Sequence, residues 1–215
     1  RDSPTTLVSM NNLASLLQDR GKLDDAEELQ RETLEAKRDI LGVRHPDTLT
    51  SMNNLAALLT AQGKLCQAED LYHEAIKAQR LILGVRHRNT LISINNLAGL
   101  LKAQNRLEAA EDLYREVYTV KCGLFGRRHP QTLTAMSTLA SLLHLEGKQD
   151  EAEELLREAL EAQREVLGAR HPHALASMNS FAMLLRVQSK LGEAEALYRE
   201  SLEGRRDVLG ASHPH

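Results

Sequence analysis

A histidine recurs along this chain every 42 residues, and this period constrains the fold more than any other feature of the sequence. Each histidine lies three residues after a glycine, and proline follows it in four of the five copies. A period of this length marks a supersecondary unit that buries its apolar face only against copies of itself. We therefore predict a single domain over residues 1–215. The recurring histidines are His45, His87, His129, His171 and His213, and the repeats span about 3–44, 45–86, 87–128, 129–170 and 171–212.

Each repeat carries two amphipathic helical patterns. In the second repeat, the apolar residues of segments 49–59 and 65–83 recur at the three- and four-residue spacing of a helix face. Pro46 suits the first turn of the first helix, and Gly63 and Gly84 end the two patterns. No segment alternates between apolar and polar residues, so the sequence predicts an all-α fold of ten helices without strands.

Small residues and charge pairs keep the same period. An alanine on each of two facing helices lets their backbones approach closely, so Ala56 and Ala68 predict the contact inside the second repeat. Five glutamates are followed four positions later by a basic residue, a spacing that supports a helix by about 0.2–0.5 kcal/mol per pair. We interpret these pairs as supports on a solvated outer face. They are Glu27–Arg31, Glu69–His73, Glu111–Arg115, Glu153–Arg157 and Glu195–Arg199.

Composition excludes several classes of partner. The net charge is −3, whereas a nucleic-acid-binding domain is normally basic, so no nucleic acid is expected. No run of 18 apolar residues exists, so no membrane span is expected. The two cysteines, Cys66 and Cys122, fall at different positions of the repeat, which predicts free thiols in a reducing compartment. The chain starts at Arg1 without an apolar signal region, and we expect it to be a segment of a longer protein.

The strings NNLAALL, GKL, AEDLY and RHP of the second repeat resemble a tetratricopeptide repeat, and the 42-residue period resembles that of kinesin light chains. The resemblance covers almost the whole chain. It implies a right-handed α-solenoid of five stacked helix-turn-helix repeats, with the first helices lining a concave groove. Some positions depart from the pattern: Arg88 replaces proline, Asn105 and Ser189 replace glycine, and Gly123 and Gly204 lie inside helices that they are expected to weaken.

The resemblance also implies which side chains line the groove. A carboxamide offers both donors and an acceptor, so it can hold a peptide main chain of any sequence. One inward column therefore gives candidate peptide-binding residues, although its asparagines could instead only tie helices together. A second column becomes basic toward the C-terminus and would favour an acidic or acid-flanked peptide. The first column is Asn11, Asn53, Asn95, Ser137 and Asn179, and the second includes Lys102, His144 and Arg186.

Neither a metal site nor a catalytic site is predicted. Stacked helices lie on the order of 10 Å apart, so one histidine per repeat cannot place several nitrogens about 2 Å from one zinc ion. We expect these histidines to cap helices at the junctions between repeats. The sequence contains none of the phosphate-binding, dinucleotide-binding, zinc-protease or nucleophile-elbow motifs. We therefore expect no cofactor, no metal and no enzymatic activity.

The function that these features favour is a cytoplasmic adaptor, associated with the cytoskeleton, that binds peptide segments of partner proteins in its groove. By the resemblance, a kinesin heavy chain is a further partner through a region outside this sequence. Two alternatives stay open: a sensor or scaffold attached to a nucleotide-binding signalling ATPase, and a regulatory domain of an enzyme whose active site lies elsewhere.

The last predicted helix carries apolar residues at positions that meet the next repeat elsewhere in the array. They are Leu202, Val208 and Leu209. A bare apolar face of a few hundred Å² is adhesive. We therefore expect this end of the array to fray and to self-associate.

Overall fold

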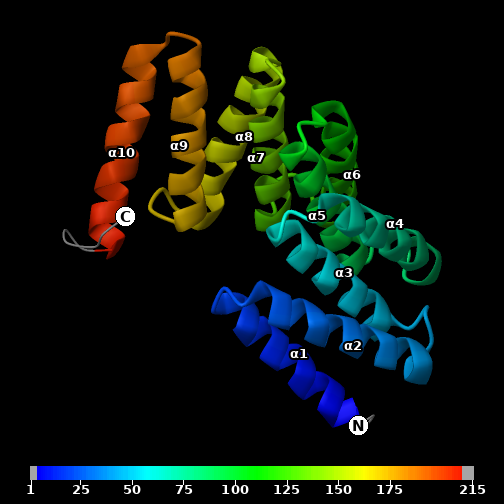
Figure 1. The fold of residues 1–215 in the computed structure, drawn as a ribbon. Coiled ribbons are helices and arrows are strands. Elements are labelled where there is room, and N and C mark those ends of the chain that lie inside the picture. The colour runs from blue at the N-terminus through cyan, green and yellow to red at the C-terminus, as the bar shows by residue number, and fades with distance from the viewer. Residues whose placement is uncertain (1–3, 210–215) are drawn as a thin grey trace. The chain divides into compact units, whose positions relative to one another are not determined.

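The computed structural model describes residues 4–209 and the side chains of residues 6–207. Within residues 4–209 the chain forms ten α-helices and no strand, which confirms the predicted all-α class (Figure 1). Each predicted repeat supplies two successive helices. The helices are α1 (Pro4–Asp19), α2 (Leu23–Leu41), α3 (Pro46–Ala61), α4 (Leu65–Ile82), α5 (Arg88–Ala103), α6 (Leu107–Phe125), α7 (Pro130–Leu145), α8 (Gln149–Leu167), α9 (Pro172–Val187) and α10 (Leu191–Leu209).

The chain divides into two compact units. The first unit, Arg1–Gln104, contains α1 to α5, and the second, Asn105–His215, contains α6 to α10. The border falls in the turn between α5 and α6, inside the third predicted repeat. A single five-repeat array over the whole chain therefore stays a prediction.

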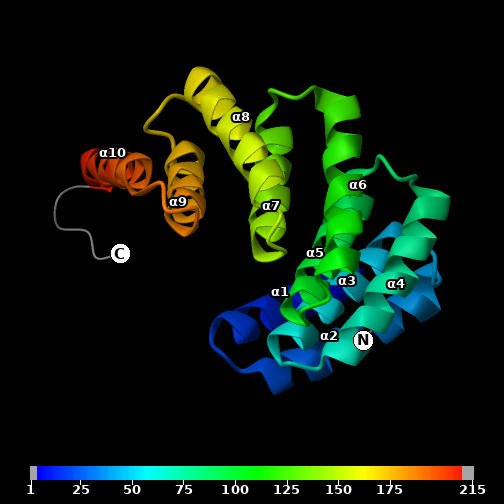
Figure 2. The same cartoon turned by 90° about the horizontal axis from the view of Figure 1, so that it is seen from above.

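Consecutive helices pack against each other within both units, as Figure 1 and Figure 2 show from two sides. In the first unit, α1 contacts α2, α2 contacts α3, α3 contacts α4 and α4 contacts α5. In the second unit, the same succession runs from α6 to α10. The first helices of neighbouring repeats also meet, because α3 contacts α5 and α7 contacts α9. This packing of helix pairs is that of the predicted TPR-like solenoid.

The recurring histidines begin the first helices, as expected. His45, His87, His129 and His171 are the N-cap residues of α3, α5, α7 and α9. In each, the ring Nδ1 accepts a hydrogen bond of 3.2 Å from the backbone N–H two residues later. The cap satisfies one of the donors that the first turn of a helix leaves unpaired. The fifth histidine of the period, His213, lies outside the described residues.

The recurring alanines lie in the cores of both units. The pair Ala56 and Ala68 is fully buried between α3 and α4. Its counterparts in the other repeats are buried to the same degree, with an exposure of 3% or less. These counterparts are Ala14 and Ala26, Ala98 and Ala110, Ala140 and Ala152, and Ala182 and Ala194.

The sequence predicts that two glycines inside second helices weaken those helices. Gly123 does not interrupt α6, which is one helix from Leu107 to Phe125. Gly204 is buried in α10, where an added Cβ would lie 2.6 Å from Cδ2 of Leu175 in α9. The missing side chain therefore lets α9 and α10 approach at this point, in addition to any loss of helix propensity.

The bare apolar face expected at the end of the last helix lies only partly inside the described residues. Leu202 of α10 is 42% exposed. The side chains of Val208 and Leu209 lie outside the described residues. Fraying and self-association of this end stay predictions.

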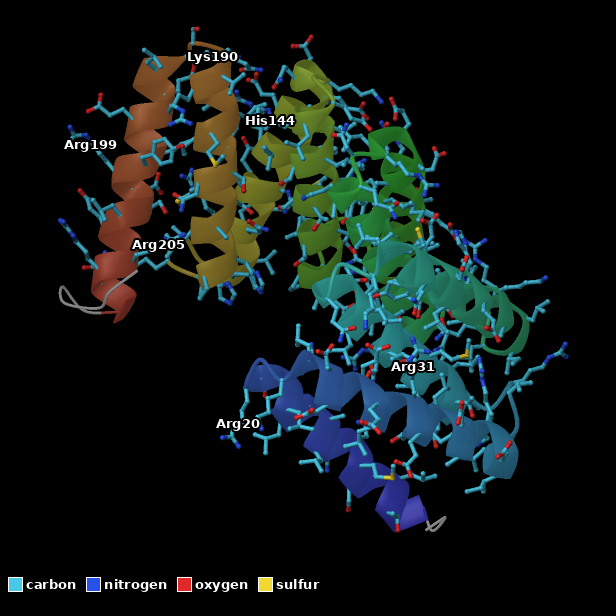
Figure 3. All side chains as sticks on the ribbon, viewed as in Figure 1. Arg20, Arg31, His144, Lys190, Arg199 and Arg205 are labelled. Carbon is cyan, nitrogen blue, oxygen red and sulfur yellow. The ribbon has the colours of Figure 1, made fainter. Side chains whose placement is uncertain are left out.

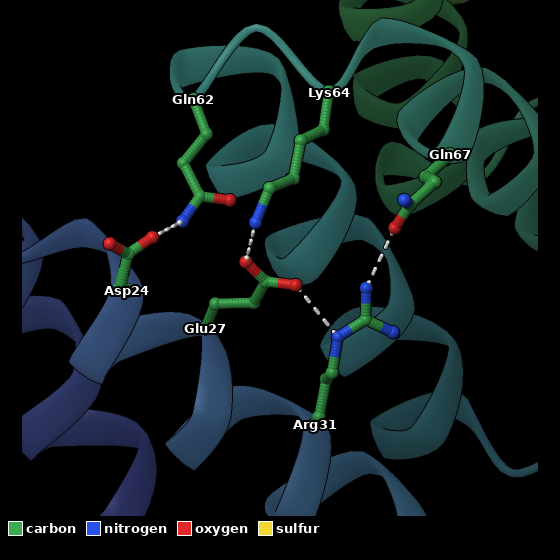
Figure 4. A network of polar contacts seen from close by, with 6 residues as sticks. All are labelled: Asp24, Glu27, Arg31, Gln62, Lys64 and Gln67. Carbon is green, nitrogen blue, oxygen red and sulfur yellow. Dashed lines mark hydrogen bonds and ion pairs between the residues drawn. The ribbon is translucent and has the colours of Figure 1, made fainter.

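The prediction that the glutamate pairs lie on a solvated face is wrong for four of the five glutamates, whose side chains are 9–18% exposed; only Glu195 of the five is well exposed. The side chain of Glu27 is only 13% exposed, because it bonds Arg31 of its own helix at 2.8 Å and Lys64 of the next repeat at 2.5 Å (Figure 4). Beside it, Gln62 donates to Asp24 across the same junction. Glu111 and Glu153 bind Lys148 and Lys190 in the same way. These ion pairs therefore join successive repeats.

Candidate functional site

The predicted groove residues lie on accessible faces of the first helices. Asn95, Lys102 and Arg186 are exposed. The other five are half-buried, although most apolar residues between the candidates on the same helices are buried. These five are Asn11, Asn53, Ser137, His144 and Asn179.

In the second unit, Ser137 lies in a hollow of about 190 Å³ between α7 and α9. Its hydroxyl donates to the carbonyl of Leu133 at 3.1 Å. Because a hydroxyl has only one proton, the contact of 3.1 Å with Ser177 Oγ places the donor on Ser177. The hollow is lined by uncharged polar residues and one histidine. They are Thr134, Ser137, Thr138, Ser141, Gln163, His173, Ala176, Ser177 and Ser180.

The hydroxyl groups that α7 contributes to this hollow use their protons inside α7. Thr134 donates to Pro130, Thr138 donates to Thr134, and Ser141 donates to Ser137, each to the carbonyl four residues earlier. Their remaining lone pairs can only accept. The hollow therefore presents hydrogen-bond acceptors, which suit the N–H groups of an extended peptide.

Ser137, Gln163 and Ser177 of this hollow have equivalents two repeats earlier, in the first unit. These three equivalent residues are polar, and each has a hydrogen-bonding atom without a partner among the described residues. The atoms are Asn53 Oδ1, Gln79 Oε1 and Ser93 Oγ, which are buried and have no partner among the described residues. Gln163 Oε1 in the second unit is also buried and has no partner among the described residues. Buried polar atoms are normally paired, so these positions are where a bound ligand or water is most expected.

The sequence reasoning missed one column that comes from the second helices. Gln163 lines the hollow from α8, and its counterparts alternate between glutamine and a cation. The signal was available, because a polar residue recurs with the 42-residue period on an otherwise apolar side of these helices. The column is Lys37, Gln79, Lys121, Gln163 and Arg205.

Two lysines of this column are half-buried cations. Lys37 donates to Ser51 Oγ at 2.7 Å. Burial lowers the pKa of Lys37, and the nearby Asp47 carboxylate opposes that shift. Burial also lowers the pKa of Lys121, whose ammonium forms no ion pair with any described residue.

The residues of the basic column have different surroundings. The His144 ring (Figure 3) contacts Gln149 Oε1 at 2.9 Å, which ties the end of α7 to the start of α8. Arg186 lines another hollow, on α9 and α10. Lys102 is exposed on α5. Asn179 also lies apart from Ser137, in a hollow that it shares with Tyr198 and Arg205.

Among residues 4–209, no group of three histidine, cysteine or acidic side chains is placed to hold a metal ion. Cys66 and Cys122 are free thiols, in agreement with the sequence prediction. No helix of the described range is long and apolar enough to cross a membrane.

Comparison with protein families identifies the repeat. The profile of the tetratricopeptide repeat matches residues 5–80, 52–122 and 131–207, which together make up most of the chain. This confirms the resemblance drawn from the sequence. Such repeats are in general protein–protein interaction modules and are typically non-catalytic. The comparison with curated protein sequences finds no match.

Solved structures of kinesin light chain type are similar to the chain over nearly its whole length. A putative kinesin light chain of Podospora anserina, with nearly identical TPR-like repeats, is 26% identical with a TM-score of 0.85, over 97% of this chain and 99% of that one. A single-residue variant of the same protein is 26% identical with a TM-score of 0.86, and the match covers 96% of this chain and 97% of that one. BtubC (BKLC) from P. vanneervenii shares the fold. It is 22% identical with a TM-score of 0.81, over 96% of this chain and 82% of that one.

Proposed function

The chain belongs to the tetratricopeptide repeat family, and from this premise we propose that it binds extended peptide segments of partner proteins along its first helices. The acceptor-lined hollow around Ser137 carries this proposal. Because the hydroxyls that α7 contributes have no free protons, and because the hollow holds no carboxylate or ammonium group, it favours main-chain N–H groups over any particular side chain. Asn53 of the first unit adds an unpaired carboxamide oxygen at the equivalent position.

The preferred peptides are acidic or flanked by acidic residues. Lys121 supports this preference, since a half-buried ammonium without a counter-ion gains from a carboxylate that enters beside it. Lys102 and Arg186 add exposed positive charge on the same helices as the asparagines. The ligand is therefore an extended segment whose main chain is held by carboxamides and hydroxyls and whose acidic side chains meet these cations.

The biological role that fits is that of a cytoplasmic adaptor, in the manner of a kinesin light chain. The similarity to the Podospora protein over nearly its full length supports this role. A kinesin heavy chain would be a second partner, bound through a region outside this sequence.

The test uses peptides selected from a random phage-displayed library on the wild-type chain. Their affinity is measured by calorimetry for wild type, for the double variant Asn53→Ala and Asn95→Ala, and for Ser137→Ala. We expect the double variant to weaken binding by about 1–3 kcal/mol if partners of buried polar atoms are lost. Its thermal midpoint should stay close to that of wild type.

Gln67→Ala is the matched control, because this exposed carboxamide accepts a bond from Arg31 away from the groove columns. It should bind the peptides with unchanged affinity. A sharp fall in the melting temperature of the double variant, with intact affinity of the folded fraction, would show that the asparagines only tie helices together. The proposal would then fail.

A further inference from the structure

A small buried residue of each following first helix faces the column of the second helices that begins at Lys37. It lies 14 positions after the column residue in every repeat, and it is a serine at three junctions and an alanine at one. All four residues are at most 6% exposed. They are Ser51 after Lys37, Ser93 after Gln79, Ala135 after Lys121, and Ser177 after Gln163.

The first lysine of this column has its partners inside the chain. Lys37 of α2 donates to Ser51 Oγ of α3 at 2.7 Å. The carboxylate of Asp47, in the first turn of α3, lies close enough to oppose the lowering of the Lys37 pKa by burial. Lys37 therefore has both a hydrogen-bond acceptor and a negative charge at its own junction.

Lys121 occupies the equivalent place in the second unit, where α6 packs against α7 (Figure 2). Thr132 Oγ1 of α7 donates to the Lys121 carbonyl at 3.3 Å, as Thr48 Oγ1 of α3 donates to the Lys37 carbonyl at 3.4 Å. The two lysines therefore start from the same position relative to the helix that follows.

Both partners of the lysine are missing at the second of these places. Ala135 stands where α3 has Ser51, and Gln131 stands where α3 has Asp47. The Lys121 ammonium is half-buried, and it forms no hydrogen bond or ion pair with any described residue. A partly desolvated ammonium without an acceptor is unfavourable, so a carboxylate that reaches it gains more than one at the surface.

The start of α7 connects this lysine to the hollow around Ser137. Gln131 is exposed, and it lies three and seven positions before Thr134 and Thr138, which line the hollow. Residues at this spacing share one face of a helix. A ligand that leaves the hollow toward the start of α7 therefore passes Gln131 and the uncompensated charge of Lys121.

We propose that the junction of α6 and α7 is the place where this chain recognises a carboxylate of its peptide ligand. Lys121 binds the carboxylate, and Ala135 and Gln131 are the specificity-determining residues that leave this lysine available. The inference rests on the proposed function and narrows its acidic preference to one junction. Lys37, whose partners lie inside the chain, contributes little to that preference.

The test uses the peptides selected on the wild-type chain, each synthesised with its acidic residues replaced one at a time by the corresponding amide. The readout is the ratio of dissociation constants between the amide and acid forms, measured by calorimetry. In wild type, one acidic residue should give a ratio of about ten. Lys121→Gln should reduce this ratio to about one, whereas Lys37→Gln should leave it unchanged. Glutamine is already present in this column at Gln79 and Gln163.

Two further variants supply Lys121 with the partners that Lys37 has. Ala135→Ser adds the hydroxyl and Gln131→Asp adds the carboxylate, and each should lower the ratio to below about three. Gln131 is exposed, so its variant is available even if the change at the buried Ala135 disturbs folding, which circular dichroism checks. Asn89→Asp is the matched control, because it adds the same charge at the same position of α5, where Gln79 replaces the lysine. It should keep the wild-type ratio.

The outcomes separate this inference from the proposed function. Peptides that bind without a dependence on any carboxylate overturn the inference and leave the proposed function standing, as does a ratio that persists in Lys121→Gln. A chain end also supplies a carboxylate, so each peptide is measured with a free and with an amidated C-terminus. A dependence on Lys121 that is confined to the free form assigns the carboxylate to the chain end. If no peptide can be selected at all, the proposed function fails and this inference fails with it.

Discussion

Lys190 Nζ lies 2.7 Å from Glu153 Oε2, which joins the turn before α10 to the first turns of α8. This bond lowers the pKa of Glu153 from its ordinary value of 4.5 to about 2, helped by Arg157 and Gln188 and opposed by burial. Because the folded pKa lies below the unfolded one, the contribution of Glu153 to stability is complete above about pH 4.5. It is lost as the pH falls toward about 2.

The first prediction is that Glu153→Gln lowers the free energy of unfolding at neutral pH by about 1–2 kcal/mol, since a charged hydrogen bond is replaced by a neutral one. Urea unfolding at several pH values measures the effect. The gap between wild type and variant should close as the pH falls from about 4.5 to about 2. A gap of constant size over this range would mean that the pair does not stabilise the fold through its charge.

Glu146 should behave in the opposite way. Burial raises its pKa, and the neighbouring Glu111 adds to this, although Lys148 Nζ lies 2.8 Å from it and opposes the shift. A carboxyl group whose pKa is raised by folding destabilises the fold where it is ionised. Glu146→Gln should therefore stabilise the protein at neutral pH.

The repeat itself suggests this change, because glutamine occupies the equivalent positions Gln62, Gln104 and Gln188. The advantage of the variant should disappear below about pH 4, where the native carboxyl is protonated. Glu203→Gln, at an exposed carboxylate of α10, is the control and should change stability little. If Glu146→Gln destabilises the chain at neutral pH, the ion pair with Lys148 outweighs the cost of burial.

The turn inside the fifth repeat carries backbone strain that the fourth repeat avoids. Ser189 has φ of 62°, where Gly147 of the fourth repeat has φ of 80°. The left-handed region costs a residue with a Cβ about 1–2 kcal/mol. Ser189→Gly should therefore raise the free energy of unfolding by about 1 kcal/mol, less the gain in unfolded-state entropy that glycine brings.

The reverse substitution provides the matched test. Gly147→Ala should lower stability by a similar amount, since an added Cβ would meet nothing within 4 Å and only the backbone is strained. Both variants are compared by thermal and urea unfolding. If Ser189→Gly is neutral while Gly147→Ala destabilises, the serine occupies its turn without the expected strain.

The period made the helices, their caps and their alanine contacts predictable, because these features depend on residues close in sequence. The inter-repeat ion pairs were not predictable in the same way. Glu27 and Arg31 satisfy the spacing of an exposed helical pair, and nothing in that spacing reveals that Lys64 approaches from the next repeat. The close approach of Gly204 to Leu175 was not predictable for a similar reason, since it depends on how α9 and α10 pack.

The groove was predictable only in part. The accessible column around Asn53 and Ser137 follows from the period of the first helices. Gln79 and Gln163 reach the same places from the second helices, and only the folded chain brings them there. His144 was assigned to the groove by its column, but its bond to Gln149 ties it to the turn of its own repeat.

The last prediction concerns the start of α5, where Arg88 occupies the position that Pro46 and Pro130 hold in other repeats. Without that proline the helix start depends more on its cap, so His87→Ala should lower the free energy of unfolding by about 1 kcal/mol. His87→Asn should retain most of the stability, because the carboxamide oxygen can accept the same bond from the N–H of Asn89. Arg88→Pro should stabilise the chain by about 0.5–1 kcal/mol through the unfolded state. Urea unfolding measures all three, and equal losses for alanine and asparagine at position 87 would show that the ring does not act as a cap.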